Sequence, residues 1–286
     1  MLKDTFFHTK RTLNAGGKLV DLSSPKVMGI LNITPDSFYS GSRFQSDKEV
    51  LSQAEKMIAE GTDFIDLGAY SSRVGAVDIS CKEELERLLP AIKLLTTHFK
   101  DAIISIDTFR AEVAERAIEA GAHMINDISG GELDANMFET VGKLKVPYIL
   151  MHMKGTPQTM ANLNQYEDMI LDIYHYFSKK MNELKSFGVN DIILDPGFGF
   201  AKNIEQNFSL LKQLGSFESL ELPLLIGLSR KSMIWRTLDI KPEEALNGTT
   251  VLHTLALQKG ATILRVHDVK EAKECIKLME IYHSSN

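Results

Sequence analysis

The sequence predicts a closed (β/α)₈ barrel preceded by a short N-terminal hairpin. Eight short aliphatic runs occur along the 286 residues, and a segment with helical periodicity follows each of them. The alternation continues without a long linker or a change in composition, which favours a barrel of parallel strands. An open, doubly wound sheet is the alternative. We expect one domain over residues 1–286, with residues 1–26 as an N-terminal hairpin extension.

The predicted strands are rich in aliphatic and β-branched residues, as is typical of parallel strands buried on both faces. They span residues 27–32, 64–68, 103–107, 124–128, 148–152, 192–195, 224–229 and 263–267. The predicted helices span residues 48–60, 82–98, 111–120, 134–143, 166–187, 204–214, 246–259 and 270–282. Before them, residues 12–22 resemble a hairpin, because Ala15, Gly16 and Gly17 can form a tight turn.

Composition is that of an ordinary globular protein, with 44% hydrophobic and 24% charged residues. A net charge of −6 argues against a nucleic-acid-binding surface, while small anions stay possible where cations gather locally. Cys81 and Cys275 lack metal-ligand spacing and are expected to be unpaired thiols. We find neither a signal-peptide pattern nor an apolar run long enough to cross a membrane, so we expect a cytoplasmic protein.

Each aliphatic run gives way to polar side chains where the predicted strand ends. In a parallel barrel these ends lie on one face, so residues far apart in the sequence would surround one mouth. The sequence therefore predicts an active site at that mouth, although any one polar residue there can also serve only to bind loop backbone. The residues are Asn32, Asp66, Asp107, Asn126, His152, Asp195, Ser229, Arg265 and His267.

Five separated motifs carry a resemblance to a known family: MGILNITPDSF, DTFRAEVAERAIEAGAHMINDISGG, DPGFGFAKN, GLSRKSM and RVHD. In this order and spacing they resemble dihydropteroate synthase, from about Val27 to the C-terminus. That family has a (β/α)₈ barrel and joins a dihydropterin pyrophosphate to p-aminobenzoate. The products are pyrophosphate and dihydropteroate, a folate precursor. The resemblance implies a dissociative reaction through a pterin-stabilised cation.

The resemblance also implies roles for residues at the strand ends. Asp195 would accept hydrogen bonds from the amino edge of the pterin, since one carboxylate can accept two donors in a plane. Asp107 and Asn126 would contact the same ring system, and Lys231 would reach its oxygen or ring nitrogen.

Pyrophosphate and metal binding would fall to three other residues. Arg265 and His267 lie two apart on one strand and therefore share a face, where they would bind pyrophosphate. Asn32 would supply an oxygen ligand to Mg²⁺ that is otherwise held by pyrophosphate and water.

Two loops are expected to complete the p-aminobenzoate pocket. Residues 34–44 offer Asp36 and Phe38, and residues 69–76 offer Ser71, Ser72 and Arg73. Phe200 would pack on the aromatic ring and Ser229 would bind the carboxylate, although Phe38 and Phe200 are equally compatible with ordinary packing. The expected catalytic residues are Asp36, Arg73, Asp107, Asp195 and Lys231.

The second loop departs from the family pattern Ser-Thr-Arg-Pro-Gly. Ser72 stands where the threonine is usual and keeps the hydroxyl, whereas Val74 stands where the proline is usual. A valine does not fix its φ angle and has an N–H donor, so loop stiffness and pocket shape are expected to differ.

Other interpretations stay open at this point. A pterin-binding methyltransferase is the nearest enzymatic alternative, and a pterin-binding protein without catalysis is another. The sequence assigns no functional role to Asp66, Asp127 and His152, and a structural one is the default. The resemblance implies a homodimer formed through outer helices near the end of the barrel. Residues 246–259 are apolar enough to allow it, although a stripe that faces the barrel gives the same pattern.

Val74 should alter discrimination between p-aminobenzoate and its sulfonamide mimics. In the variant Val74→Pro, the ratio of the two dissociation constants should change because the loop is stiffer. Calorimetric titration with both ligands measures the ratio, and two unchanged affinities would contradict the hypothesis.

Overall fold

The computed structural model describes residues 10–33, 43–71 and 78–285. Its centre is one sheet of eight parallel strands in the order β8-β7-β6-β5-β4-β3-β10-β9. The sheet closes where Leu194 forms a parallel bridge to Leu224, and the Leu194 amide donates to the Pro223 carbonyl at 2.8 Å. The strands are β3 (Lys26–Asn32), β4 (Phe64–Gly68), β5 (Ile104–Asp107), β6 (Met124–Asp127), β7 (Tyr148–Met151), β8 (Ile192–Asp195), β9 (Leu225–Ile226) and β10 (Ile263–Val266).

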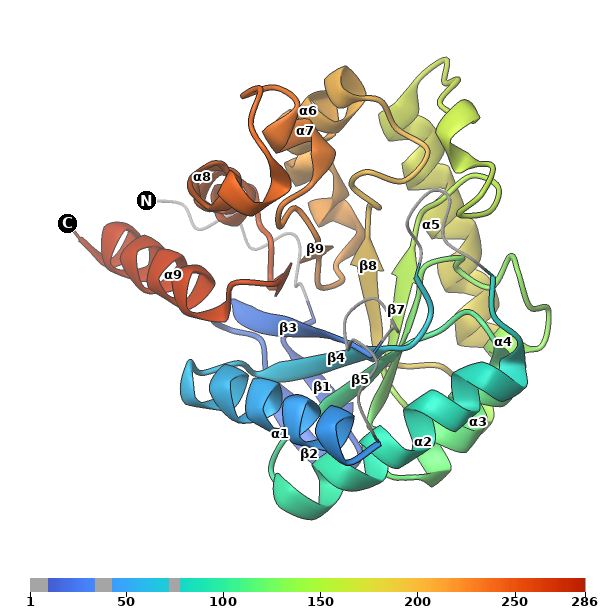
Figure 1. The fold of residues 1–286 in the computed structure, drawn as a ribbon. Coiled ribbons are helices and arrows are strands. Elements are labelled where there is room, and N and C mark those ends of the chain that lie inside the picture. The colour runs from blue at the N-terminus through green and yellow to red at the C-terminus, as the bar shows by residue number, and fades with distance from the viewer. Residues whose placement is uncertain (1–9, 34–42, 72–77, 286) are drawn as a thin grey trace.

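Helices surround this sheet on its outer side (Figure 1). Local side-chain chemistry sets several of their starts: the Ser80 hydroxyl accepts from the Glu83 amide, and Asn203 and Gln206 form a reciprocal capping box. The α-helices are α1 (Arg43–Ala59), α2 (Cys81–His98), α3 (Ala111–Glu119), α4 (Met137–Leu144), α5 (Met169–Ser186), α6 (Ile204–Lys212), α7 (Ser232–Trp235), α8 (Leu246–Gln258) and α9 (Val269–Ser284). Three 3₁₀ helices are η1 (Met160–Asn162), η2 (Leu214–Leu220) and η3 (Pro242–Glu244).

The predicted hairpin is present as β1 (Thr12–Ala15) and β2 (Lys18–Asp21), which pair antiparallel. Its turn uses Gly16 and Gly17 at positive φ. Leu13 and Leu22 pack against apolar side chains from the first residues of the barrel strands, so the hairpin covers the N-terminal end of the barrel. That cluster contains Met28, Phe64, Met124, Ile149, Ile193, Leu225 and Ile263.

All eight predicted strands are present, which confirms the barrel. The seventh is much shorter than residues 224–229, because Leu228 to Lys231 form a turn in which Arg230 has a φ of 52°. Helix α4 starts three residues later than predicted, since the Asp134 carboxylate binds the amides of Ala111 and Asn136 in a turn. The short helix α7 was not predicted. The single-domain organisation stays a prediction.

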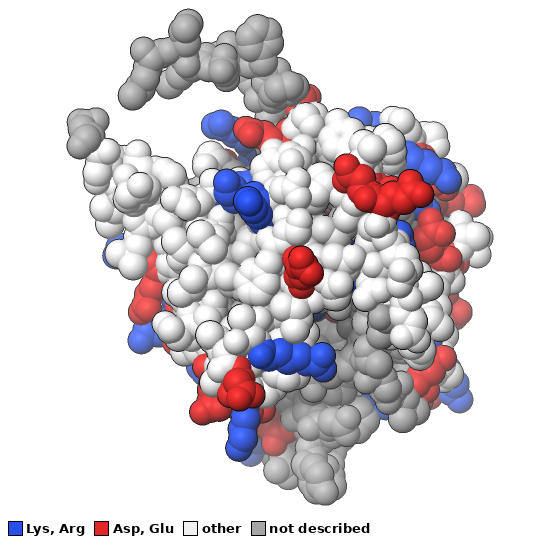
Figure 2. Space-filling view, turned by 90° about the horizontal axis from the view of Figure 1, so that it is seen from above, with Lys and Arg blue, Asp and Glu red and all other residues white. Residues whose placement is uncertain are grey.

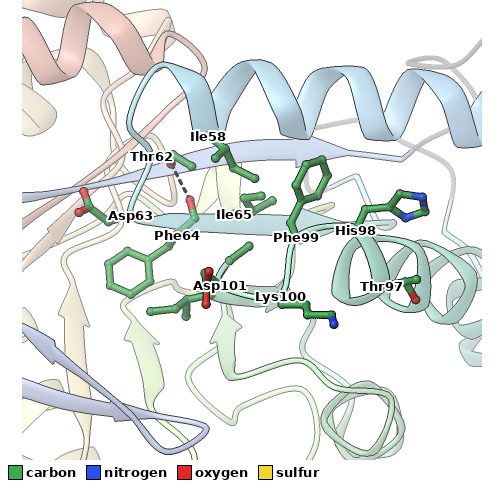
Figure 3. Close-up of a pocket in the computed structure, with 12 residues that line it drawn as sticks. Ile58, Thr62, Asp63, Phe64, Ile65, Thr97, His98, Phe99, Lys100 and Asp101 are labelled. Carbon is green, nitrogen blue, oxygen red and sulfur yellow. Dashed lines mark hydrogen bonds between the residues drawn. The ribbon is translucent and has the colours of Figure 1, made fainter.

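A pocket of about 490 Å³ lies at the N-terminal ends of β4 and β5 (Figure 3). The polar residues predicted for the site lie toward the C-terminal ends of the strands. Thr62, Phe64 and Ile103 line the pocket together with residues from the ends of α1 and α2. On the face in Figure 2, basic and acidic side chains are spread among uncharged ones. No helix in the described part of the chain is long and apolar enough to cross a membrane.

Candidate active site

Arg265 joins two carboxylates at the C-terminal mouth of the barrel. Its Nε donates to Asp66 Oδ2 and its Nη2 to Asp107 Oδ2, each at 2.6 Å. Asn126 Nδ2 donates to the same Asp66 oxygen at 3.0 Å. Strands β4, β5, β6 and β10 each supply one of these residues, and Asp107 is in register with both Gly68 and Asn126. The network therefore links strands on both sides of β3.

Because the network is largely shielded from solvent, its charged groups strongly shift one another's pKa values. Asp66 has no exposed surface, and its second oxygen, Oδ1, has no hydrogen-bond partner among the described residues. Desolvation raises the pKa of Asp107, and the neighbouring Asp66 adds to the rise while Arg265 opposes it. Desolvation also disfavours the Arg265 cation, yet the two carboxylates raise the pKa of its guanidinium above the usual value. Arg265 is therefore charged at any ordinary pH.

Asp195 ends β8 and is held by the turn that follows it. Its Oδ1 accepts from the Gly197 amide at 2.8 Å. Gly197 has a φ of 73°, and a Cβ there would lie 2.1 Å from the His152 carbonyl oxygen, so only glycine fits. Desolvation raises the pKa of Asp195, whereas the Gly197 amide and the cations of Lys231 and Arg265 oppose the rise.

Lys231 lies beside Phe200, with its Nζ 4.4 Å from the ring centroid. Gly199 permits this approach, because a Cβ there would stand 3.1 Å from Lys231 Cδ. Burial lowers the pKa of Lys231 to about 8, with Arg265 acting in the same direction and Asp195 and Asp107 opposing. Such a lysine can lose its proton within a physiological range.

Arg230 precedes Lys231 and is directed elsewhere. Its Nε and Nη2 each donate to Asp268 at 2.8 Å, and its Nη1 donates to the Glu243 carbonyl at 2.7 Å. It thereby ties the turn after β9 to the start of α9. We infer that this bidentate pair holds the backbone that carries Lys231.

Ser229 and His267 contact each other at the ends of β9 and β10. The Ser229 Oγ lies 3.0 Å from His267 Nδ1 and also accepts from the His267 amide at 3.2 Å. Burial lowers the pKa of His267 to about 4, and the nearby Arg265 cation adds to the effect. The imidazole is therefore neutral at neutral pH and can donate one N–H.

Asn32 ends β3 in register with Gly68. A Cβ on Gly68 would lie 3.5 Å from Asn32 Oδ1 and 3.4 Å from Asp107 Cβ, so the two side chains flank this glycine. The side-chain amide of Asn32 makes no hydrogen bond to the residues that the structure describes, so its Oδ1 can accept a cation. Within those residues no group of three or more His, Cys, Asp or Glu could hold a metal. A hard cation that takes one protein oxygen and draws its other ligands from substrate and water fits this arrangement.

The structure thus brings most of the predicted residues to one mouth. Asp36, Phe38, Ser72, Arg73 and Val74 lie outside the described residues. The others fall into connected groups around the network: Asn32, Asp107, Asn126, Asp195, Phe200, Ser229, Lys231, Arg265 and His267.

Sequence reasoning gave no functional role to Asp66, which is the partner of Arg265. The sequence did contain a signal, because a carboxylate inside the otherwise apolar run 64–68 needs a charged or hydrogen-bonding partner. Asp127 does have a structural role: it accepts from the Ser129 and Gly131 amides and from the Tyr148 hydroxyl. His152 contacts Lys202, a residue that the sequence did not single out.

Comparisons with known proteins assign the chain to a family. The sequence model of the family described as pterin binding enzyme matches residues 28–267. Dihydropteroate synthase of Escherichia coli K12 is 41% identical over 270 residues, covering 94% of this chain and 95% of that protein. The chain belongs to the dihydropteroate synthase family. Dihydropteroate synthase of Synechocystis is 46% identical over 257 residues, 89% of each chain, in keeping with this assignment.

Solved structures of the family agree with the barrel. Yersinia pestis dihydropteroate synthase, in a sulfonamide drug complex, has a TM-score of 0.89 at 40% identity over 96% of this chain and 100% of that one. Xanthomonas albilineans dihydropteroate synthase with 4-aminobenzoic acid has a TM-score of 0.90 at 33% identity over 97% and 100%. The resemblance inferred from the five motifs is confirmed, and the methyltransferase alternative gains no support.

Removal of the Asp66 carboxylate should destabilise the barrel. Asp66→Ala removes the fully buried partner of Arg265 and leaves its partly buried guanidinium with one carboxylate instead of two, so we expect a loss of about 3 kcal/mol in the free energy of unfolding. Urea unfolding followed by circular dichroism measures it. Glu139→Ala, which removes an exposed ion pair with Lys143, is the control and should stay close to wild type. Equal stability of the two variants would contradict a central role for Asp66.

Proposed function

We propose that the protein joins 6-hydroxymethyl-7,8-dihydropterin pyrophosphate to p-aminobenzoate, giving 7,8-dihydropteroate and pyrophosphate. The observation that carries the proposal is the partly buried Asp66–Arg265–Asp107 network beside Asp195 and Lys231, in a chain 41% identical to a dihydropteroate synthase. A pterin needs planar acceptors and a donor, and the leaving pyrophosphate needs cations. Both kinds of group are present at this mouth.

For the pterin, the Asp195 carboxylate is the proposed acceptor for two N–H groups of the amino edge. Asn126 and Asp107 would contact the same ring system, and the Lys231 ammonium would donate to its oxygen or ring nitrogen. The raised pKa of Asp195 is in keeping with a carboxylate that gains stabilising hydrogen bonds when the pterin displaces solvent.

For the reaction, the bond between the pterin methylene carbon and the pyrophosphate oxygen breaks first, and its electron pair leaves with pyrophosphate. Carboxylates near the ring favour the resulting cation electrostatically. Arg265, oriented by Asp66, and His267 would hold the departing pyrophosphate. The amine of p-aminobenzoate then forms the new carbon–nitrogen bond and releases a proton.

We propose Mg²⁺ as the cofactor, with Asn32 as the residue that would hold it. When bound, the ion would neutralise charge on pyrophosphate. For p-aminobenzoate, Phe200 and Ser229 are the proposed contacts, together with Phe38 and Ser72. Asp36 and Arg73 are proposed catalytic residues from the same two loops.

The test is product formation by purified protein given the pterin pyrophosphate, p-aminobenzoate and Mg²⁺. Asp195→Asn should lower kcat/KM by at least about 100-fold, because a pre-oriented charged acceptor is lost. Asp191→Asn, near the other end of the same strand and bound to Lys10, is the matched control and should retain activity. If the protein binds a pterin but forms no product, the proposed function is wrong, and the remaining interpretations are a methyltransferase and a pterin-binding protein without catalysis.

Pterin affinity should depend on the protonation of Lys231. The ammonium is present below the pKa of about 8 and lost above it, so affinity should fall roughly tenfold as the pH rises through that value. Fluorescence titration with a pterin between pH 6 and 10 measures this. Lys231→Met should bind weakly at every pH; a wild-type pH profile in this variant would exclude Lys231 as the source.

We also propose a cytoplasmic homodimer. Two free cysteines support the compartment. Helices α8 and α9 pack together, and each exposes large apolar side chains, among them Val251 on α8 (52% exposed) and Leu278 on α9 (69% exposed). Leu278→Glu should therefore give a monomer in light scattering, whereas Leu19→Glu, on the exposed hairpin, should not change the mass. A dimer in both variants would place the interface elsewhere.

A further inference from the structure

A buried lysine, Lys202, belongs to the segment that joins β8 to α6. Its Nζ contacts the carbonyl oxygens of Gly197 and Phe200 and the Nδ1 of His152, each at 3.1 Å. An ammonium group has three N–H donors, so these three acceptors satisfy it fully. Lys202 is 9% exposed and His152 3% exposed. An ammonium so deeply placed has a high desolvation cost, which calls for a specific role.

These contacts form a closed cycle around the Asp195 carboxylate. The His152 amide donates to the Asp195 carbonyl at 2.9 Å, and His152 Nδ1 meets Lys202. Lys202 donates to the Gly197 carbonyl, and the Gly197 amide donates to Asp195 Oδ1 at 2.8 Å. Each residue of the cycle thus restrains the next one. The carboxylate cannot rotate freely without breaking a bond in this ring.

The same lysine fixes the position of Phe200. Lys202 holds the Phe200 carbonyl, and the Phe200 amide donates to the Gly197 carbonyl at 3.1 Å. On the other side of the segment, the Gly199 amide donates to Asn207 Oδ1 at 2.7 Å. The Phe200 ring then lies against Lys231. One buried lysine therefore helps to fix the orientation of the Asp195 carboxylate and the position of the Phe200 ring beside Lys231.

We propose that Lys202, together with His152, is a positioning residue of the pterin site: it orients Asp195 and Phe200 through hydrogen bonds and its charge, without contact to substrate. The inference rests on the proposed function, because it concerns the same pterin pocket.

The charges around Lys202 make this role testable by pH. Four groups face it: His152 from the end of β7, Lys154 from the following segment, Asp195 from β8 and Lys231 from the turn after β9. Burial lowers the pKa of Lys202 to about 7; Asp195 opposes the shift, and the two lysines add to it. Burial also lowers the pKa of His152 well below its usual value, so the imidazole is neutral and can accept at Nδ1.

The Lys202 cation in turn lowers the pKa of Asp195. Without the Lys202 charge, the pKa of Asp195 should rise. Asp195 should then take up its proton at a higher pH, so the fall of pterin affinity on the acidic side of the pH profile (the acidic limb) should begin at a higher pH. A residue with a purely structural function would not move this limb of the pH profile.

The experiment measures the affinity of 6-hydroxymethylpterin by calorimetry between pH 4.5 and 9 for three variants of the full chain. Lys202→Met keeps the length of the side chain and removes its donors and charge. It should weaken binding about 10- to 100-fold at neutral pH and shift the acidic limb to higher pH. Lys202→Arg should restore part of the affinity. Lys154→Met removes a nearby charge, leaves the cycle intact and should bind like wild type.

Wild-type affinity and pH profile in Lys202→Met would overturn the inference, as would a pH-independent loss that merely follows a lower Tm. Should Lys202→Met fail to fold, His152→Leu removes one acceptor of the cycle and should shift binding in the same direction, and unchanged binding there would also overturn it. Because the readout is pterin binding, the outcome is distinct from a failure of the wild type to form dihydropteroate, which would reject the proposed function instead.

Discussion

The mouth of the barrel depends on one interaction, in which the guanidinium of Arg265 donates to two carboxylates, Asp66 and Asp107. A guanidinium at this depth is tolerable only when paired, and Arg265 finds its partners on β4 and β5, across β3 from its own strand. Asp66 Oδ2 also accepts a hydrogen bond from the side-chain amide of Asn126, so this one oxygen joins side chains of β4, β6 and β10. The positions of the side chains at this mouth are thus set by the fold itself.

The barrel separates stability and chemistry between its two ends. At the N-terminal end, the first residues of the strands form an apolar layer that the hairpin covers with Leu13 and Leu22. At the C-terminal end, the same strands carry carboxylates, amides and cations that pair with one another. Such a division is a general property of this architecture, since strand directions are parallel and every strand contributes to both faces.

The strands, the helices and most residues of the mouth could be predicted, because hydrophobic periodicity and polar strand ends are local signals. The partners of those residues could not. Asp66 and Arg265 are 199 positions apart, and a single sequence contains no local signal for such a pairing. Lys202 was missed for the same reason: its three acceptors are defined by a loop conformation and by His152, which directly follows β7. The early end of β9 depends on the left-handed Arg230, whose bond to Asp268 forms only in the folded chain.

The hairpin affects how substrates enter the site and how products leave it. Since it covers the N-terminal end of the barrel, molecules bound among the strand ends share one entrance and exit at the opposite end. In the proposed reaction the pterin binds Asp195 and Asn126, which are 6% and 3% exposed. In that reaction both substrates would enter, and pyrophosphate would leave, through the same opening. Because the N-terminal end of the barrel is closed, the fold as a whole, and no single side chain, determines the route by which substrates bind and products leave.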